Sequence, residues 1–283
     1  AQPLVRCMHR KPRVGRECDT IPSKTTEPIL PPHRLLTLCE PWRSGLEALG
    51  LITLAPFLAL APRGDGHCVL VLPGFATDDQ ATTLLRLFLA QRGYDARGWD
   101  LGWNLDHKTV GEQGEIIGAR IAALCKDSGR TVSLVGWSLG GVIAREAARR
   151  MPDAIRNVIT LGSPFAGDPS ANAIRGLYER LSGNIIDTPA VRLRYAQGGE
   201  LLPVPATAVF SRTDGIAAWQ NCVGAESATN ENIEVISSHF GLVANPAVLH
   251  LVADRLAQPE GEWRPFARPD AISFLYPDGP MVM

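Results

Sequence analysis

The chain has 283 residues, 45% of them hydrophobic, which is enough to bury a sizeable core in one large domain or in one domain with an appendage. Its 28 basic and 29 acidic residues leave a formal net charge of −1, so the overall charge indicates neither a nucleic-acid partner nor a strongly charged substrate. Six scattered cysteines without a CxxC pair exclude a disulfide-stapled scaffold and a zinc knuckle, while a single Cys7–Cys18 bridge stays open.

The first 43 residues are rich in proline and charge and predict an irregular N-terminal arm. Residues 1–16 carry five basic side chains and no acidic one, so this part either touches an anionic surface or, more simply, is solvated. No charged stretch followed by an apolar one opens the sequence. We therefore expect a signal peptide to be absent or already removed, which leaves a cytoplasmic and a secreted location both open.

Residues 45–62, GLEALGLITLAPFLALAP, form an almost wholly apolar run that is interrupted by Glu47 and Pro56. A membrane span needs roughly 20 uninterrupted apolar residues, and a proline inside the run breaks the backbone hydrogen bonds of a helix. The run predicts a helix packed on the main domain, with peripheral contact to a lipid surface as the alternative.

From residue 63 onward the sequence predicts one α/β domain. Short β-branched runs alternate with amphipathic stretches of helical spacing, and this alternation is typical of a mainly parallel sheet with helices on both faces. The expected strands are residues 68–74, 94–101, 131–136, 157–164, 206–215 and 232–238, and the helices that close the central and last units are residues 139–151 and 246–257. Ligand sites in such sheets lie beyond the carboxyl ends of the strands.

The connection between the fourth and fifth expected strands, residues 165–203, is longer than an ordinary loop. It contains one plausible helix, SANAIRGLYERLSG, followed by a mixed stretch that ends in GGELLPVP. Long connections in compact domains tend to be functional. We therefore expect a small helical lid at the edge of the active site.

Ser138 is the candidate nucleophile. It lies in GWSLG, which matches the pattern G-x-S-x-G, and it follows an expected strand and opens an expected helix. Flanking glycines leave room for a tight turn, and the N-terminus of the helix offers free N–H groups to an oxyanion. The alternative, a phosphate-binding turn, lacks both the G-x-G-x-x-G spacing and a following Lys-Ser/Thr pair.

A serine nucleophile needs a base, and His239 is the best candidate among the six histidines. It alone follows a strand and precedes a turn into the last helix. The other five lie in the arm, at the wrong end of the first strand, in an exposed connection, or at helical spacing: His9, His33, His67, His107 and His250.

Asp214 is the expected acid, because it ends the fifth strand and gives the chain order serine, acid, histidine. Its carboxylate can orient the imidazole and stabilise the charged form. Asp187, in the expected lid, is the reserve candidate. Asp78, Asp79 and Asp100 are more simply helix caps and turn residues.

The expected oxyanion hole combines two backbone N–H groups. One belongs to Leu139, next to the nucleophile, and the other to Phe75, directly after Pro73-Gly74 at the end of the first strand. The sequence PGF, residues 73–75, could be an ordinary turn without a function. It lies at the same edge of the sheet as Ser138, and this place favours a functional role.

Together these residues resemble the α/β-hydrolase family, in particular its bacterial lipase and esterase branch. The resemblance rests on VLVLPGF, LVGWSLGGVIAREAA, ITLGSPFAG, SRTDGIAAW and SSHFGLVANPAVL, which span residues 67–257. The chain departs from the family's lipases in having Pro73-Gly74 where they usually have His-Gly, and residues 1–62 have no counterpart in the minimal fold. The stretch Trp99–Asn104, which with the preceding glycine reads GWDLGWN, suggests no chemical role.

The expected function is hydrolysis of carboxylic esters through a Ser138-His239-Asp214 triad and an acyl-enzyme, without a metal or other cofactor. A hydrophobic acyl ester is the expected substrate, and nucleic acid is not an expected partner. Acyl transfer or amide hydrolysis by the same triad remains an alternative, as does a non-catalytic binding protein on the same fold. The choice between lipase and esterase and the oligomeric state stay open.

Overall fold

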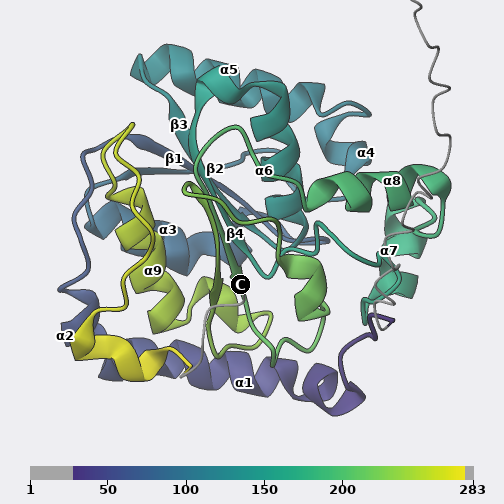
Figure 1. Ribbon diagram of the computed structural model, residues 1–283, viewed down its shortest axis with the longest axis horizontal. Coiled ribbons are helices and arrows are strands. Elements are labelled where there is room, and N and C mark those ends of the chain that lie inside the picture. The colour runs from purple at the N-terminus through teal and green to yellow at the C-terminus, as the bar shows by residue number, and fades with distance from the viewer. Residues whose placement is uncertain (1–27, 278–283) are drawn as a thin grey trace, which may run out of the picture.

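The sheet is fully parallel, as the alternation of strands and helices predicted. The structure is a computed structural model, and it describes residues 28–277 of the chain. Within them six strands pair in the order β2-β1-β3-β4-β5-β6 (Figure 1). Their bounds are β1 Cys68–Leu72, β2 Asp95–Gly98, β3 Val132–Trp137, β4 Ile155–Leu161, β5 Ala206–Phe210 and β6 Asn230–Glu234. The expected fold class, an α/β sheet covered by helices, is confirmed.

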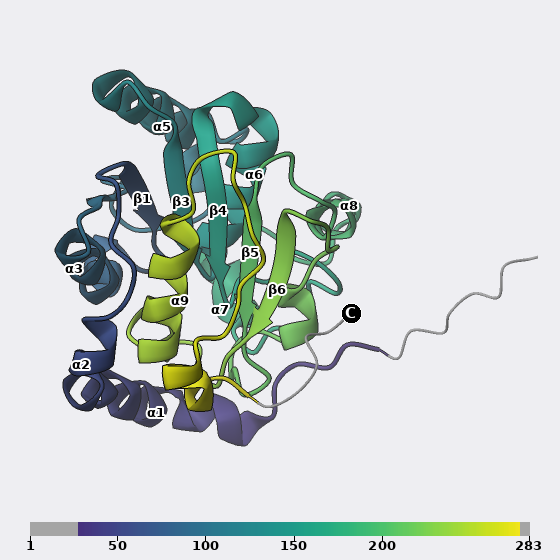
Figure 2. The same cartoon turned by 60° about the vertical axis from the view of Figure 1, so that its left-hand side comes forward.

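Two apolar cores lie on opposite faces of the sheet, because side chains alternate along each strand. Val69 and Val71 point into the core beneath α3 (Thr83–Gln91) and α9 (Pro246–Leu256). Leu70 points the other way, into the core beneath α5 (Glu115–Ser128) and α6 (Leu139–Arg150). Figure 2 shows α3 and α9 on one side of the strands and α5 on the other.

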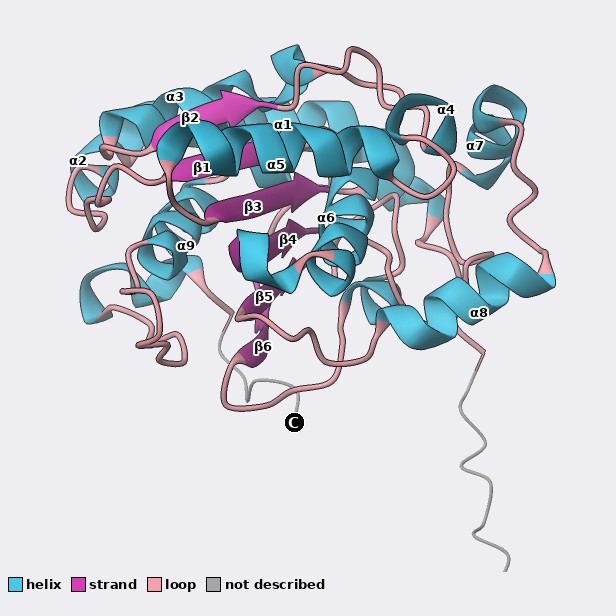
Figure 3. Ribbon diagram, turned by 90° about the horizontal axis from the view of Figure 1, so that it is seen from above, coloured by secondary structure: helices cyan, strands magenta, loops and turns pink. Residues whose placement is uncertain are grey.

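The strands point toward α7 (Arg175–Ser182) and α8 (Pro189–Gly198), which lie beyond their carboxyl ends (Figure 3). The insertion after β4 thus contains two helices where the sequence indicated one. Its second helix begins with the pair Thr188-Pro189, in which the threonine side chain accepts from the N–H of Val191 at 3.3 Å. Threonine at the N-cap and proline at the first helical position are favourable start signals that were overlooked in the mixed stretch.

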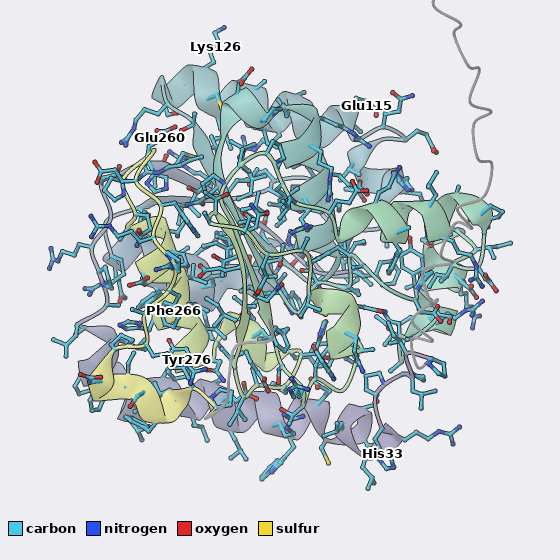
Figure 4. All side chains as sticks on the ribbon, viewed as in Figure 1. His33, Glu115, Lys126, Glu260, Phe266 and Tyr276 are labelled. Atoms are coloured by element: carbon cyan, nitrogen blue, oxygen red, sulfur yellow. The ribbon has the colours of Figure 1, made fainter. Side chains whose placement is uncertain are left out.

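A long helix at the N-terminal side corrects one expectation. The irregular arm was predicted over residues 1–43, yet α1 covers Arg34–Thr53, with His33 at its N-cap (Figure 4). Pro41 lies inside this helix, although proline usually ends one. Residues 1–27 lie outside the described part of the chain. The expected helix in the apolar run is the end of α1 together with α2 (Ala55–Leu58); the two helices are separated at Leu54, and Pro56 lies in the first turn of α2.

The C-terminal segment completes the side of the sheet that α9 covers. Phe266 and Tyr276 are buried there, and the Tyr276 hydroxyl donates to the carbonyl of Ala247 at 3.0 Å (Figure 4). Within residues 28–277 no helix has both the length and the apolar character to cross a membrane. The short α4 (His107–Val110) and five 3-10 turns connect the main elements: Asp79–Thr82, Pro152–Ala154, Trp219–Cys222, Gly241–Val243 and Asp270–Leu275.

Candidate active site

A sharp turn between β3 and α6 holds Ser138. Its φ of +54° lies in the left-handed region that residues other than glycine rarely adopt. A Cβ at Gly136 would lie 2.4 Å from the Cα of Gly141, and a Cβ at Gly140 would lie 2.4 Å from the carbonyl oxygen of Leu72. Both flanking positions therefore need glycine for a steric reason. The turn lifts the serine side chain out of the sheet at the N-terminus of α6.

The structure brings the three expected side chains together in one chain of hydrogen bonds. The His239 Nε2 lies 3.0 Å from the Ser138 Oγ, and its Nδ1 lies 2.7 Å from the Asp214 Oδ2. A carboxylate accepts only, so the Nδ1–H donates to Asp214 and leaves Nε2 free to accept from the serine hydroxyl. This is the tautomer that a general base for Ser138 requires.

The Asp214 carboxylate is itself fixed by backbone donors. Its Oδ1 accepts from the N–H of Ile216 and from that of Ala217, both at 2.8 Å. The second oxygen is thereby turned toward His239. Because both N–H donors need an oxygen opposite them, the carboxyl group cannot rotate without losing two buried hydrogen bonds.

A buried glutamate from α1 contacts the same two loops. The Glu40 side chain is 0% exposed, and its carboxylate accepts from the N–H of Gly215 at 2.7 Å and from that of His239 at 3.0 Å. Glu40 was not predicted as a site residue, because it lies in the segment that was interpreted as an irregular arm. No local pattern singled it out, because a helix is normally recognised by an apolar inner face.

Charge around His239 raises the pKa of its imidazole above the ordinary 6.5. Burial alone lowers this pKa, since it disfavours the charged form. The nearby charge of Asp214, its hydrogen bond and the charge of Glu40 act in the opposite direction and prevail. The site thus stabilises the imidazolium that forms when a base takes the serine proton.

The two expected oxyanion donors lie beside the nucleophile. A Cβ on Gly74 would come within 3.3 Å of the Ser138 Cβ and 2.9 Å of the Trp137 ring, so the loop that carries Phe75 passes directly over the serine. Over residues 28–277, the N–H groups of Phe75 and Leu139 have no acceptor in the protein. Two free donors next to a serine are what an oxyanion needs.

Asn104, in the stretch that suggested no role, holds the Phe75 loop in place. Its side-chain amide donates to the carbonyl of Pro73 at 2.8 Å. Its backbone accepts from Ala76 and donates to Thr77, each at 2.8 Å. Ala76 has a φ of +53°, so the loop is strained and needs these contacts. The stretch Trp99–Asn104 is therefore structural support for the expected oxyanion loop.

A mostly apolar cavity lies next to Ser138, between α6 and the insertion of residues 165–203. Phe75 contacts Tyr178 of α7, with their ring centroids 4.9 Å apart. Apolar side chains form most of the wall, and Arg194 of α8 closes one side; the remaining lining residues are Leu139, Val142, Pro164, Asn172, Ile174, Ile186, Val191 and Tyr195. The insertion of residues 165–203 thus forms one wall of the cavity beside the serine.

Buried polar contacts fasten both lid helices to the body. Asp106 accepts from the hydroxyl of Tyr178 on α7, and its carboxylate lies 3.6 Å from the guanidinium of Arg194 on α8. The guanidinium groups of Arg145 and Arg149, both on α6, donate to the carbonyl of Gly198 at the C-terminal end of α8. Cations at that end of a helix also complement its dipole.

A second Ser-His-Asp arrangement lies at the opposite end of β3. His67 bonds the Ser133 Oγ at 2.8 Å through Nε2 and the Asp65 Oδ1 at 2.5 Å through Nδ1. Ser133 lies within the strand, is fully buried, and has neither a sharp turn nor a helix N-terminus beside it. Hydrogen bonding alone therefore does not distinguish a nucleophile. Of the two serines, Ser138 is the one that lies beside a sharp turn, free N–H donors and a cavity.

The remaining candidates lie away from Ser138. His33 caps α1, His107 begins α4, and His250 is buried in α9, whereas His9 lies outside the described residues. Asp187, the reserve acid, forms an ion pair with Arg192 on the lid at 2.5 Å.

The expected structural aspartates cap and shape turns. Asp78 caps a 3-10 turn, Asp79 accepts from the N–H groups of Trp99 and Asp100, and Asp100 itself has a φ of +60°.

A parallel sheet covered by helices, with a serine at a strained strand-to-helix turn and a histidine and an aspartate from later loops, defines the α/β-hydrolase class. The family model described as "Alpha/beta hydrolase family" matches residues 54–278. The chain belongs to this family.

Individual relatives are distant. The chain is 32% identical over 109 residues to a pimeloyl-[acyl-carrier protein] methyl ester esterase of Shewanella sp. (strain MR-7), a match that covers 38% of this chain and 39% of that protein. Lipase B of Aspergillus fumigatus superposes with a TM-score of 0.54 at 19% identity, over 70% of this chain and 53% of that one. The Bacillus licheniformis lipase BlEst2 superposes with a TM-score of 0.47 at 17% identity, over 68% of this chain and 91% of that one. The chain thus spans about 39% and 53% of the first two proteins, and the likeness to lipase B supports the fold.

Proposed function

We propose that this protein is a carboxylic-ester hydrolase in which Ser138 is the nucleophile, His239 the general base and Asp214 the acid that orients it. The observation that carries the proposal is a hydrogen-bonded serine at a strained turn that faces both free N–H donors and an apolar cavity. The Shewanella relative, whose name states that it acts on a methyl ester, supports the same reaction type.

The proposed reaction has two halves. His239 takes the proton of Ser138 as its Oγ attacks the ester carbonyl, and the resulting oxyanion accepts from the N–H groups of Phe75 and Leu139. Collapse of this intermediate expels the alcohol, which receives the proton from His239. Water, activated by the same imidazole, then attacks the acyl-enzyme and releases the acid and free Ser138.

The cavity wall favours an ester with an apolar acyl group. We expect kcat/KM for p-nitrophenyl esters to rise from acetate toward octanoate, by up to about fourfold per methylene while the chain still enters the cavity. A rate that is flat across the series would contradict acyl binding in this cavity. Free acid should be the main product when glycerol is added, whereas accumulation of glyceryl ester would identify an acyltransferase.

A matched pair of variants locates the acyl group. Val191→Trp fills the cavity from α8 and should lower kcat/KM for octanoate about tenfold or more while acetate is little affected. Leu193→Trp adds the same ring to an exposed position of the same helix and should leave both rates unchanged. Equal effects of the two substitutions would place the acyl group elsewhere.

A further inference from the structure

The helix α1 presents a buried carboxylate to both loops of the proposed triad. Besides the N–H groups of Gly215 and His239, Glu40 accepts from the N–H of Phe240 at 3.1 Å. Gly215 directly follows Asp214, and Phe240 directly follows His239. One side chain therefore ties together the backbone of the acid loop after β5 and the backbone of the base loop after β6.

Three N–H groups, two of them in buried hydrogen bonds, depend on this one side chain. Hydrogen bonds to an ionised carboxylate are stronger than those between neutral groups, and removing the acceptor leaves each donor without a partner. A catalytic triad tolerates little displacement, because a shift of 1 Å costs about a hundredfold in rate. The position of His239 relative to Ser138 thus depends on Glu40.

Other contacts of α1 hold it against the same loops. The Thr37 hydroxyl donates to the carbonyl of Gly215 at 2.6 Å, and Arg43 donates to the carbonyl of Thr213 at 2.6 Å. One turn further along, Glu47 accepts from the N–H of Ser238 at 2.6 Å. The helix is therefore docked along the back of both loops, and Glu40 lies at the centre of the contact.

We propose that Glu40 is a positioning residue for the triad, so that α1 forms part of the active-site architecture. This inference rests on the proposed hydrolase function. The family match begins at residue 54, after the end of α1 at Thr53, so the family pattern does not supply this residue. Glu40 touches no reacting atom, and it acts through the backbone of His239 and of the residue that follows Asp214.

Glu40→Gln tests the proposal, because the amide keeps the shape but removes the charge and turns one acceptor into a donor. We expect kcat to fall about 10- to 100-fold with little change in KM. The charges that face His239 come from Asp214 on its loop and from Glu40 on α1, with Arg43 3.8 Å from Glu40. Loss of the Glu40 charge should lower the pKa of His239, and with it the midpoint of the acidic limb of kcat/KM.

Thr37→Val is the matched control, since it loosens the same helix without a change in charge. It should leave the midpoint of the acidic limb at the wild-type pH.

If Glu40→Gln fails to fold, as judged by circular dichroism and thermal unfolding, Glu40→Asp keeps the charge but withdraws the carboxylate by one methylene. It should lower kcat while the midpoint stays near that of the wild type. Wild-type kcat in Glu40→Asp, or equal pH profiles in Glu40→Gln and Thr37→Val, would overturn the proposal. Wild-type protein without ester hydrolysis would instead overturn the proposed function.

The outer face of α1 carries a second, independent observation. A helix on a protein surface usually turns its apolar side inward, but α1 turns its acids Glu40 and Glu47 toward the protein. Its exposed side is an apolar stripe that is half to three-quarters exposed, formed by Leu35, Leu38, Trp42, Leu46, Leu49 and Ile52. Exposed apolar patches of this kind mark interaction surfaces.

We infer that this stripe docks on an anionic lipid surface. The exposed face of α1 has no acidic residue, and the only charged side chain on it is that of Arg34. Residues 1–27, which precede the described part of the chain, hold six basic and three acidic residues, and this excess of positive charge complements anionic headgroups. Trp42 lies in the middle of the stripe, and tryptophan favours the boundary between headgroups and acyl chains.

Co-sedimentation with lipid vesicles tests this inference on the full chain. The protein should pellet with vesicles of phosphatidylcholine and phosphatidylglycerol in equal parts, and much less with phosphatidylcholine alone or at high salt. The triple variant Leu38→Ser, Trp42→Ser, Leu49→Ser should reduce the bound fraction about tenfold or more while it still hydrolyses a water-soluble ester. Absence of wild-type binding, or a stripe-dependent dimer in sedimentation velocity without vesicle binding, would overturn it.

Discussion

Ser138→Ala is expected to lower kcat for p-nitrophenyl ester hydrolysis by about 10⁴- to 10⁶-fold. The alanine cannot form the acyl-enzyme, and the free N–H groups of Phe75 and Leu139 can then supply only the residual catalysis of a polarised carbonyl. Steady-state hydrolysis by the purified variant measures this loss. The fold should be kept, because an alanine is smaller than the serine that it replaces.

Ser133→Ala is the control that the structure itself offers. Ser133 is hydrogen-bonded to His67, which is bonded to Asp65, so it imitates the connectivity of the proposed triad at the other end of β3. It lacks the left-handed turn and the free donors. We expect Ser133→Ala to keep wild-type kcat. If it lost activity and Ser138→Ala did not, the assignment would be reversed.

Asp214→Asn should lower kcat about 10⁴-fold at neutral pH. The N–H groups of Ile216 and Ala217 require an oxygen at the Oδ1 position, so the amide nitrogen must take the place that faces His239. An amide N–H there forces the imidazole to accept at Nδ1 and to carry its proton on Nε2. That tautomer cannot accept from Ser138. Initial rates measured across pH will show the loss.

Asp187→Asn separates the two acids that the sequence allowed. Asp187 pairs with Arg192 on the exposed side of the lid, and an exposed ion pair contributes little to stability. The variant should therefore retain kcat within about twofold. A large loss in Asp187→Asn, together with normal rates in Asp214→Asn, would move the acid to the lid.

The acid limb of the pH profile follows from the environment of His239. The base must be neutral to accept a proton, and its pKa is raised above 6.5 in the folded protein, chiefly by Asp214 against the opposing effect of burial. We therefore expect kcat/KM of the wild type to rise with pH through a midpoint above 6.5. In Asp214→Asn the main charge that raises this pKa is absent, so any residual activity should extend to lower pH.

The sequence predicted the sheet well because β1, β3, β4 and β5 are short apolar runs with β-branched residues that are buried throughout. Ser138, Asp214 and His239 could be proposed because each follows a strand, and parallel strands end at one edge. Their contacts could not be derived, since the fixed orientation of Asp214 depends on N–H groups of the loop that follows it. The role of Asn104 could not be derived either, because its side chain contacts the carbonyl of Pro73, which lies 31 residues away along the chain.

The N-terminal helix was only half predicted, and the reason is physical. The segment up to residue 43 was interpreted as an irregular arm because it is rich in proline and charge, yet Pro41 lies inside α1, and Glu40 and Glu47 face the protein. Helical periodicity is normally recognised by its apolar inner face. In α1 that pattern is inverted, so the contact of Glu40 with His239, 199 residues away along the chain, had no local signal that a propensity argument would weigh.

The most direct test of the account is covalent labelling with a fluorophosphonate, followed by mass spectrometry of the digested protein. A fluorophosphonate reacts with a serine that has an activated hydroxyl and an oxyanion hole. We predict a single stoichiometric adduct on the peptide that contains Ser138, formed at the wild-type rate in Ser133→Ala and absent from Ser138→Ala. An unlabelled Ser138 in folded wild-type protein, or an adduct on Ser133, would contradict the proposed nucleophile.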